Sequence, residues 1–268
     1  MATILGFASI SLKAQNTVGV LTFDEYQASE GYNLIYPTVQ SNVFLMDNCG
    51  RVVHTWIDNS IYRPGNTVYL LEDGNILKTK RHIAVAGDPI WAGGGGDFVE
   101  LWDWDNNLLW SVSFNDSTQR AHHDAFPMPN GNVMMILWEY VDSTTAAEAG
   151  RDTNKIGYGY IWPDYLLEVT PIYPDSYAVA WEWHAMDHLV QDFDSTKANY
   201  GDPAQEIGKL DFNFLGIEGN RPDWLHLNTI DYDEELDQVM VSCPEFNEIW
   251  IIDHSTTIQE AAGSTGGN

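Results

Sequence analysis

The sequence predicts an all-β protein with the architecture of a β-propeller, and three observations carry this prediction. Short apolar runs with alternating polar positions recur along the chain, and turn-forming Asn, Asp, Gly and Pro separate them. Neighbouring runs pair as hairpins, several of which end on tryptophan. The hairpin pattern returns after about 55 residues, a period typical of propeller blades built from four short strands. A β-sandwich is the alternative architecture, but it does not predict the recurring Trp-ended hairpin.

The expected strands follow one another with short turns between them. They are rich in β-branched and aromatic residues, and turn segments such as 72–75 and 129–132 join them. In chain order, the strands or the hairpins that contain them cover residues 17–22, 31–36, 42–47, 51–56, 67–71, 76–79, 98–102, 108–110, 123–138, 165–169, 177–183, 226–242 and 248–253.

We expect two successive hairpins to form the repeating unit. The units then cover 42–79, 98–138, 165–242 and 248 onward. The third is longer because of an insertion, 184–218, whose first residues have helical spacing for a turn or two. About four blades are therefore predicted, in an incomplete propeller domain that spans 16–268. A closed propeller brings its last blade against its first, so we expect the chain to be a fragment that lacks C-terminal blades.

Composition limits the classes of function. Apolar residues make up 44% of the 268 residues, and 11 Trp and 13 Tyr are present, which indicates a folded domain. The net charge of −27, from 39 acidic and 12 basic residues, repels phosphate backbones, so nucleic-acid and anionic-membrane binding are not expected. Two cysteines, Cys49 and Cys243, are too few for a disulfide scaffold, and the sequence leaves their pairing open.

The N-terminal residues 1–15 are typical of a secretory signal peptide. Small and apolar residues run from Ala2 to Leu12, and Lys13-Ala14-Gln15 follows, although a basic start is missing. The run is too short to span a membrane, and no other stretch qualifies. We therefore expect export to the periplasm or the medium.

Two histidine sites stand before two similar strand pairs. The first is the segment Asp223-Trp224-Leu225-His226-Leu227-Asn228, and the second is Ala121-His122-His123-Asp124. In an extended segment the side chains at i and i+2 share a side, so His226 and Asn228 could face one cavity as acid, base or nucleophile and as oxyanion donor. Neighbouring residues face opposite ways, so we expect only one of the histidines at 122 and 123 to enter the site. Asp124 could orient an imidazole. Alternatively, each histidine caps a strand or fills a polar core position.

Other motifs carry less weight. Arg120 and Arg221 stand just ahead of the two histidine sites and could offset an anionic substrate; alternatively they form surface salt bridges. His184 and His188 have the spacing of a metal pair, but no Glu follows the first, and packing is the better interpretation. The glycine run 93–96 lacks the residues of a phosphate loop and is expected to be a flexible connection. We predict no metal site and no cofactor.

These motifs together resemble the bacterial PAPS-independent arylsulfate sulfotransferases. The resemblance covers nearly the whole chain from Tyr32, and the Asp-Trp-x-His-x-Asn element is its most specific part. It implies a six-bladed β-propeller that moves a sulfuryl group from a phenolic sulfate ester to a phenol through a sulfo-histidine intermediate. By this resemblance His123 and His226 bind the sulfuryl group or assist proton transfer, with Asn228 beside them, and we expect these three to be the catalytic residues. We also expect His122, Arg120, Arg221 and Trp224 to contact the substrate.

Two departures from the family pattern are visible. The nucleophilic histidine of the family aligns beyond Asn268, so it is not among these residues. An arginine is also expected just past the serine that ends the 238–242 strand, where the sequence reads Cys243-Pro244-Glu245. A non-catalytic, secreted propeller that serves as a binding or interaction module is therefore the alternative function.

Overall fold

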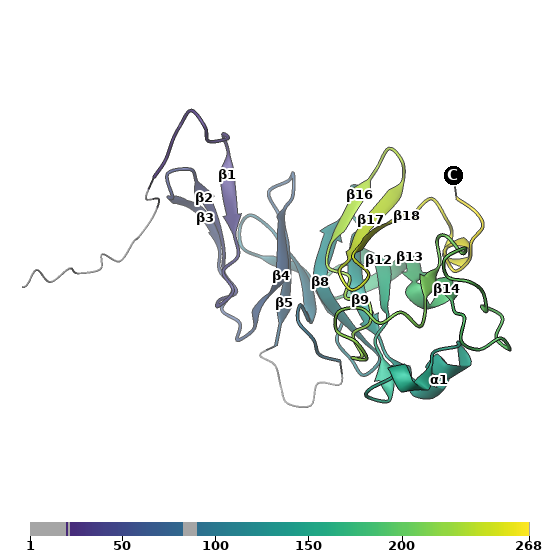
Figure 1. The fold of residues 1–268 in the computed structure, drawn as a ribbon. Helices are drawn as coiled ribbons and strands as arrows, with labels where there is room; N and C mark the ends of the chain where they lie inside the picture. The colour runs from purple at the N-terminus through teal and green to yellow at the C-terminus, as the bar shows by residue number, and fades with distance from the viewer. Residues whose placement is uncertain (1–19, 21, 83–89, 268) are drawn as a thin grey trace, which may run out of the picture.

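Short strands paired with their nearest neighbours dominate the computed structural model, which describes residue 20 and residues 22–82 and 90–267. Four principal antiparallel sheets follow one another across this part of the chain (Figure 1). The first sheet contains β1 (Tyr32–Ile35), β2 (Val43–Asp47) and β3 (Val52–Trp56), and the second contains β4 (Arg63–Leu70), β5 (Ile76–Arg81), β6 (Phe98–Trp102) and β7 (Leu108–Ser113). The third contains β8 (Gln119–Pro127), β9 (Val133–Glu139), β12 (Asp164–Ile172) and β13 (Ser176–His184), and the fourth contains β16 (Ile230–Asp233), β17 (Gln238–Cys243) and β18 (Glu248–Asp253).

Smaller elements lie in the connections. The β9–β12 connection contains β10 (Val141–Asp142), α1 (Ser143–Glu148), the 3₁₀ turn η1 (Thr153–Lys155) and β11 (Tyr160–Ile161), and the connection from the third to the fourth sheet contains η2 (Ala185–His188), β14 (Leu189–Val190) and β15 (Leu210–Asp211). A short helix, α2 (Ile258–Ala261), follows β18. The expected helical turn after Trp183 is η2, whereas α1, which the Asp142 side chain caps at Thr145 N, was not predicted.

The all-β prediction is confirmed, but the predicted grouping of hairpins is wrong. Each predicted unit began with the hairpin that closes one sheet and ended with the hairpin that opens the next. In the structure β5 pairs with β6, with Ile76 opposite Trp102, so the second sheet joins residues 63–81 to 98–113. The hairpin of β2 and β3 belongs to the first sheet instead. Hairpin periodicity fixes the repeat length but not where a unit starts, because both hairpins look alike in sequence.

The core lies between successive sheets. Strand β9 is buried on both faces, which explains its continuous apolar run. Met135 and Leu137 pack in the cluster shared with the second sheet, whereas Met134 and Ile136 pack toward the fourth sheet. The alternation along one strand therefore fixes the third sheet between its two neighbours.

Buried polar groups also connect the sheets near their first strands. The carboxylate of Asp124, on β8, accepts hydrogen bonds from the Tyr69 hydroxyl of β4 (2.9 Å) and from the Ile230 backbone N–H of β16 (3.0 Å). Three sheets thus meet at one side chain. The expectation that Asp124 orients an imidazole is not met, since both oxygens serve these contacts. Sheets that meet along their first strands agree with propeller blades, but the described sheets do not close into a ring.

Several sequence expectations concern other parts of the chain. Residues 1–15 and most of the predicted strand 17–22 lie outside the described residues. Cys49 is exposed, Cys243 is buried, and each is a free thiol. Within the described residues, no helix combines the length and apolar character needed to cross a membrane.

Candidate active site

Two histidine rings from different sheets meet at the candidate site. His123 belongs to β8 of the third sheet, and His226 lies in the loop that leads to β16 of the fourth. Their ring centroids are 4.6 Å apart and the rings meet edge to face at 75°. Because more than a hundred residues separate them in the chain, only the packing of the two sheets brings the imidazoles together.

A β-bulge places His123. The register of β8 against β9 shifts between His122 and Ala125, and His123 has a left-handed backbone with φ of 51°. Its N–H donates to the Gly94 carbonyl (2.8 Å), and Gly94 itself has φ of +83°. A Cβ on Gly94 would lie 2.0 Å from the His123 ring. The glycine run 93–96, expected to be a flexible connection, is therefore a turn that seats the His123 imidazole.

The carboxylate of Asp223 holds His226. His226 also has a left-handed backbone, with φ of 56°, and its Nδ1 lies 2.5 Å from Asp223 Oδ2. The other carboxylate oxygen accepts a hydrogen bond from Trp138 Nε1 at 2.9 Å. The hydrogen bond between His226 and Asp223, together with the negative charge of Asp223, raises the pKa of His226 against the opposing effect of burial. His226 is thus biased toward its imidazolium form.

His122 lies behind the pair in the protein interior. Its ring stacks on Trp138 at 3.8 Å, and its Nδ1 lies 3.1 Å from Nδ1 of His123. Its Nε2 is 2.5 Å from Asp164 Oδ1, although these atoms are not aligned as a regular hydrogen bond. We expected only one of the two adjacent histidines to enter the site, and His122 is the one enclosed in the interior. The reasoning behind that expectation does not hold, because the bulge breaks the strand alternation and brings the two rings into contact.

Burial sets the charge of these inner groups. It lowers the pKa of His122 to about 3, and it raises the pKa of Asp164 well above its usual value. Burial and the neighbouring His122 and His226 lower the pKa of His123 to about 3 as well. An uncharged imidazole at His123 therefore faces a histidine, His226, whose pKa is shifted in the opposite direction, which is a combination suited to acid–base chemistry.

A cavity of about 370 Å³ opens beside His226. We call it the His226 cavity. Aromatic side chains and carboxylates line most of it, and a single arginine is present. The lining residues are Trp91, Ala92, Tyr158, Tyr160, Trp162, Glu218, Arg221, Pro222, Asp223, His226 and Glu245.

The predicted substrate contacts separate into two groups. Arg221 lines the His226 cavity, where its guanidinium pairs with Glu218. Arg120 instead is buried, donates to Asp97 Oδ1 (2.7 Å) and to the Ile90 carbonyl (2.8 Å), and lies over the Trp91 ring. Its guanidinium holds the loop that carries the glycine turn against β8 through hydrogen bonds to the Gly96 and Ile90 carbonyls. Arg120 therefore stabilises the turn against which the His123 ring packs.

His123, Trp224 and Asn228 do not line the His226 cavity, although His123 reaches it through its ring contact with His226. Trp224 is buried in the core and its Nε1 donates to the Phe214 carbonyl (3.1 Å). Asn228 is exposed, and its amide oxygen accepts a hydrogen bond from the Ser242 hydroxyl. The left-handed backbone at His226 breaks the extended geometry that would have turned both side chains to one side.

Four residues of the site were not predicted from the sequence. Asp164 and Trp138 belong to ordinary strand patterns, and Gly94 belongs to a run without a phosphate-loop signature. Glu245 occupies the neighbourhood where the family resemblance suggests an arginine. The signals that could have indicated them are weak: a carboxylate beginning an otherwise apolar strand, and a glycine cluster opposite a pair of histidines.

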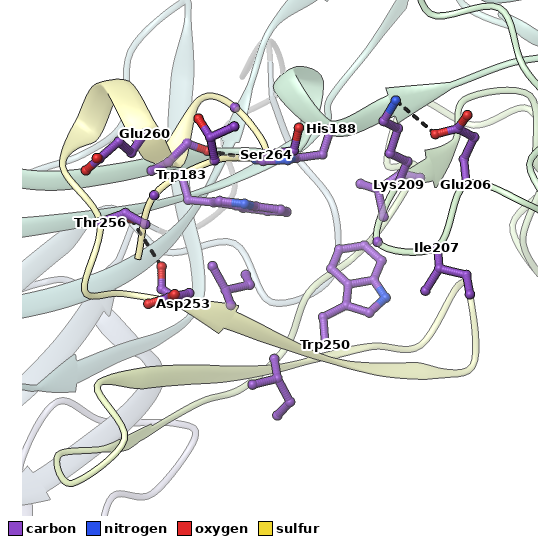
Figure 2. Close-up of a pocket in the computed structure, with 18 of the residues that line it drawn as sticks. Trp183, His188, Glu206, Ile207, Lys209, Trp250, Asp253, Thr256, Glu260 and Ser264 are labelled. Atoms are coloured by element: carbon purple, nitrogen blue, oxygen red, sulfur yellow. Dashed lines mark hydrogen bonds and ion pairs between the residues drawn. The ribbon is translucent and has the colours of Figure 1, made fainter. Parts of the chain in front are cut away.

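A second and larger cavity, of about 550 Å³, lies near the C-terminal segment (Figure 2). The indoles of Trp183 and Trp250 face it, and the Lys209–Glu206 ion pair borders it. Its one histidine, His188, is fixed by a 2.9 Å contact of Nε2 with the Ala261 carbonyl and stacks on Trp183. The His226 cavity is the better candidate, because the ring of its lining histidine contacts a second imidazole, His123, just behind the cavity wall.

Across residues 22–82 and 90–267, no group of three or more His, Cys, Asp and Glu side chains is arranged to hold a metal ion. His184, one of the spaced histidines, contacts Glu139 and Glu182 and stacks on Tyr165. These contacts agree with the packing role expected for it.

The sheets and the paired imidazoles define an all-β protein with a two-histidine candidate site, and comparison with known proteins assigns the family. Residues 24–267 match the arylsulfotransferase (ASST) family, so the chain belongs to that family. No curated protein matches the chain. A solved protein of unknown function from Bacteroides caccae is similar at 11% identity with a TM-score of 0.38, over 85% of this chain and 60% of that one.

Proposed function

We propose that the protein moves a sulfuryl group from a phenolic sulfate ester to a phenol, with His123 and His226 acting on the reacting oxygens. The observation that supports this most directly is the close approach of two imidazoles, with ring centroids 4.6 Å apart, whose pKa values are shifted in opposite directions. Family membership supports the class of reaction. The substrate class and the roles of the residues are parts of the proposal.

The chemistry has two halves. In the first, the S–O bond of the donor ester breaks as a histidine nitrogen bonds to sulfur, and the donor phenolate leaves. In the second, the S–N bond breaks as the acceptor oxygen bonds to sulfur. The resemblance to the family implies this histidine intermediate. The His226 imidazolium would stabilise negative charge on the sulfuryl oxygens or protonate the leaving phenolate.

His123 would handle the acceptor proton. Its Nδ1 contacts His122 Nδ1, and the His122 ring reaches Asp164 on its other side. When His123 carries its proton on Nδ1, its Nε2 has a lone pair that can accept the proton of the attacking phenol. The low pKa keeps His123 uncharged at neutral pH, as a base must be before the reaction.

Aromatic side chains next to His226 suit aromatic substrates. Trp162 lies 6.1 Å from Trp138 between ring centroids and stacks with Tyr160 at 5.7 Å, and Tyr158 continues the series toward solvent. A phenyl ring can pack on such surfaces in offset or edge-to-face geometry, with about 0.5–1.5 kcal/mol per pair beyond area burial.

The test is turnover of an aryl sulfate such as 4-nitrophenyl sulfate, with a phenol acceptor, by the full-length protein. We expect His123→Ala and His226→Ala to lower kcat by roughly 10²–10⁴-fold, the usual contribution of acid–base groups. His184→Gln is the matched control, because that histidine contacts Glu139 and Glu182 away from the His226 cavity. Wild-type rates in both alanine variants would reject the assignment. A mass increase of one sulfuryl group on a histidine peptide would support the intermediate.

The alternative is a binding module without catalysis. Glu245 favours it, because a carboxylate in the His226 cavity repels a sulfate ester. A protein that binds phenols but turns over no aryl sulfate, with either histidine present, would establish this alternative.

We also propose that the protein is exported to the periplasm or the medium. The support is the signal-like composition of residues 1–15. N-terminal sequencing of the protein after expression in a bacterial host would show cleavage near residue 15, whereas an intact Met1 start on cytoplasmic protein would contradict export.

A further inference from the structure

The charges that line the His226 cavity do not balance. The Glu218 carboxylate forms an ion pair with Arg221, and the Asp223 carboxylate forms one with His226. Glu245 is the remaining carboxylate of the lining. Among the described residues, no Lys, Arg or His forms an ion pair with it. Glu245 is therefore the one lining carboxylate that forms no ion pair with a described residue, although its charge also helps to raise the pKa of His226.

Glu245 is held in place. Its side chain is 94% buried, as its relative exposure of 6% shows, and its Oε2 accepts a hydrogen bond from the Glu218 N–H at 2.9 Å. The backbone of Gly216 packs so closely that a Cβ there would lie 2.3 Å from Oε2. A buried carboxylate in a fixed position is a specific partner for a cation, because little side-chain freedom is lost when the cation binds.

The remaining wall of the cavity is aromatic. Trp91, Tyr158, Tyr160 and Trp162 line it, and the Tyr160 and Trp162 rings stack with an interplanar angle of 22°. Aromatic faces accept both a phenyl ring and a nearby ammonium group, the latter through cation–π attraction. The same wall therefore suits both ends of an aromatic amine.

We propose that the His226 cavity selects phenols that carry a protonated amine, with the ring on the Tyr160–Trp162 wall and the ammonium at Glu245. The identification of the ligand as a phenol rests on the proposed function, whereas the preference for a cation rests on the charges of the cavity. In this arrangement the phenolic oxygen points to His226, which shares the same cavity.

Binding of three phenols of similar size tests the proposal without requiring turnover. The probes are tyramine, which carries an ammonium group, 4-ethylphenol, which is neutral, and 3-(4-hydroxyphenyl)propionate, which carries a carboxylate. Titration calorimetry at neutral pH should give tyramine a Kd about tenfold lower than that of 4-ethylphenol, and the carboxylate probe should bind most weakly. Equal Kd values for tyramine and 4-ethylphenol would overturn the proposal.

Variants separate Glu245 from the general acidity of the protein. Glu245→Gln retains an acceptor for the Glu218 N–H and should abolish the tenfold preference, whereas Glu245→Asp should retain part of it. Glu235→Gln, in the exposed β16–β17 turn, changes the net charge equally and should leave the preference intact. Unchanged selectivity in Glu245→Gln would contradict the proposal. Thermal unfolding of each variant establishes that it is folded.

The two proposals fail in different ways. Turnover of aryl sulfates with no preference for tyramine would retain the sulfotransferase proposal and overturn the cation preference. Selective tyramine binding without any turnover would retain the cation preference and favour the binding module.

Discussion

At the scale of single residues, His123 and His226 show how surroundings decide the charge of identical side chains. His123 is pressed against Gly94 and His122, with no carboxylate in contact, and burial lowers its pKa. His226 contacts Asp223, whose charge raises the pKa of the imidazole. The pKa values of the two imidazoles are therefore shifted in opposite directions although the rings are in contact.

The carboxylate of Asp223 should set the pH range over which His226 is charged. Replacing it in Asp223→Asn removes the main cause of the raised pKa, so the His226 titration should move to lower pH. If the imidazolium assists transfer, the alkaline limb of the pH–rate profile should move with it. NMR titration of the imidazole protons measures the first effect. Asp231→Asn, at an exposed position of β16, is the control, and an unmoved titration in Asp223→Asn would contradict the argument.

The same linkage bears on stability. A raised pKa in the folded state means that the Asp223–His226 pair contributes fully below the unfolded histidine value of about 6.5, and that this contribution is lost as pH rises through the folded value. Asp223→Asn should remove this pH dependence.

At the scale of elements, the β8 bulge and the glycine turn act together to position the His123 side chain. The bulge turns His123 out of the strand alternation, and the turn supplies a surface without side chains against which the ring lies. Arg120 of β8 links the two, because its guanidinium donates hydrogen bonds to the Gly96 and Ile90 carbonyls of the loop. Neither element would place the imidazole alone.

Gly94→Ala should test this device, because the new methyl group would overlap the His123 ring and would also occupy a left-handed backbone position. We expect turnover to fall at least tenfold and stability to fall by roughly 1–3 kcal/mol. Gly93→Ala is the matched control, since a Cβ there meets nothing within 4 Å. Equal activity of the two variants, with unshifted His123 resonances, would show that the turn does not position the ring.

At the scale of the whole molecule, hydrogen bonds of buried polar side chains fix the positions of the sheets relative to one another. Asp124 joins the second, third and fourth sheets, and Trp138 of the third sheet joins Asp223 ahead of the fourth. Apolar packing between sheets tolerates small slides, whereas these directional contacts do not. The distance between His123 and His226 depends on this registration.

Asp124→Ala should therefore destabilise the protein by about 3 kcal/mol, since it removes two hydrogen bonds to a buried charge and leaves the Ile230 N–H without a partner. Tyr69→Phe removes only one of these bonds and should cost about 1 kcal/mol. Urea unfolding at constant m-value measures both. Equal effects of the two variants would show that the Ile230 contact contributes nothing.

The sequence by itself determined the strands of this protein and its family. Strands such as 98–102 and 248–253 were predicted with their observed bounds, because alternation and turn residues are local signals. Motif spacing identified the histidines at 122, 123 and 226 for the same reason. Only the tertiary structure decided which hairpins share a sheet, that the adjacent histidines at 122 and 123 lie in contact, and that Arg120 and Trp224 serve the interior. It also decided that Glu245 lines the cavity. These facts depend on left-handed backbone positions and on contacts between residues distant in the chain, and neither leaves a periodic trace in the sequence.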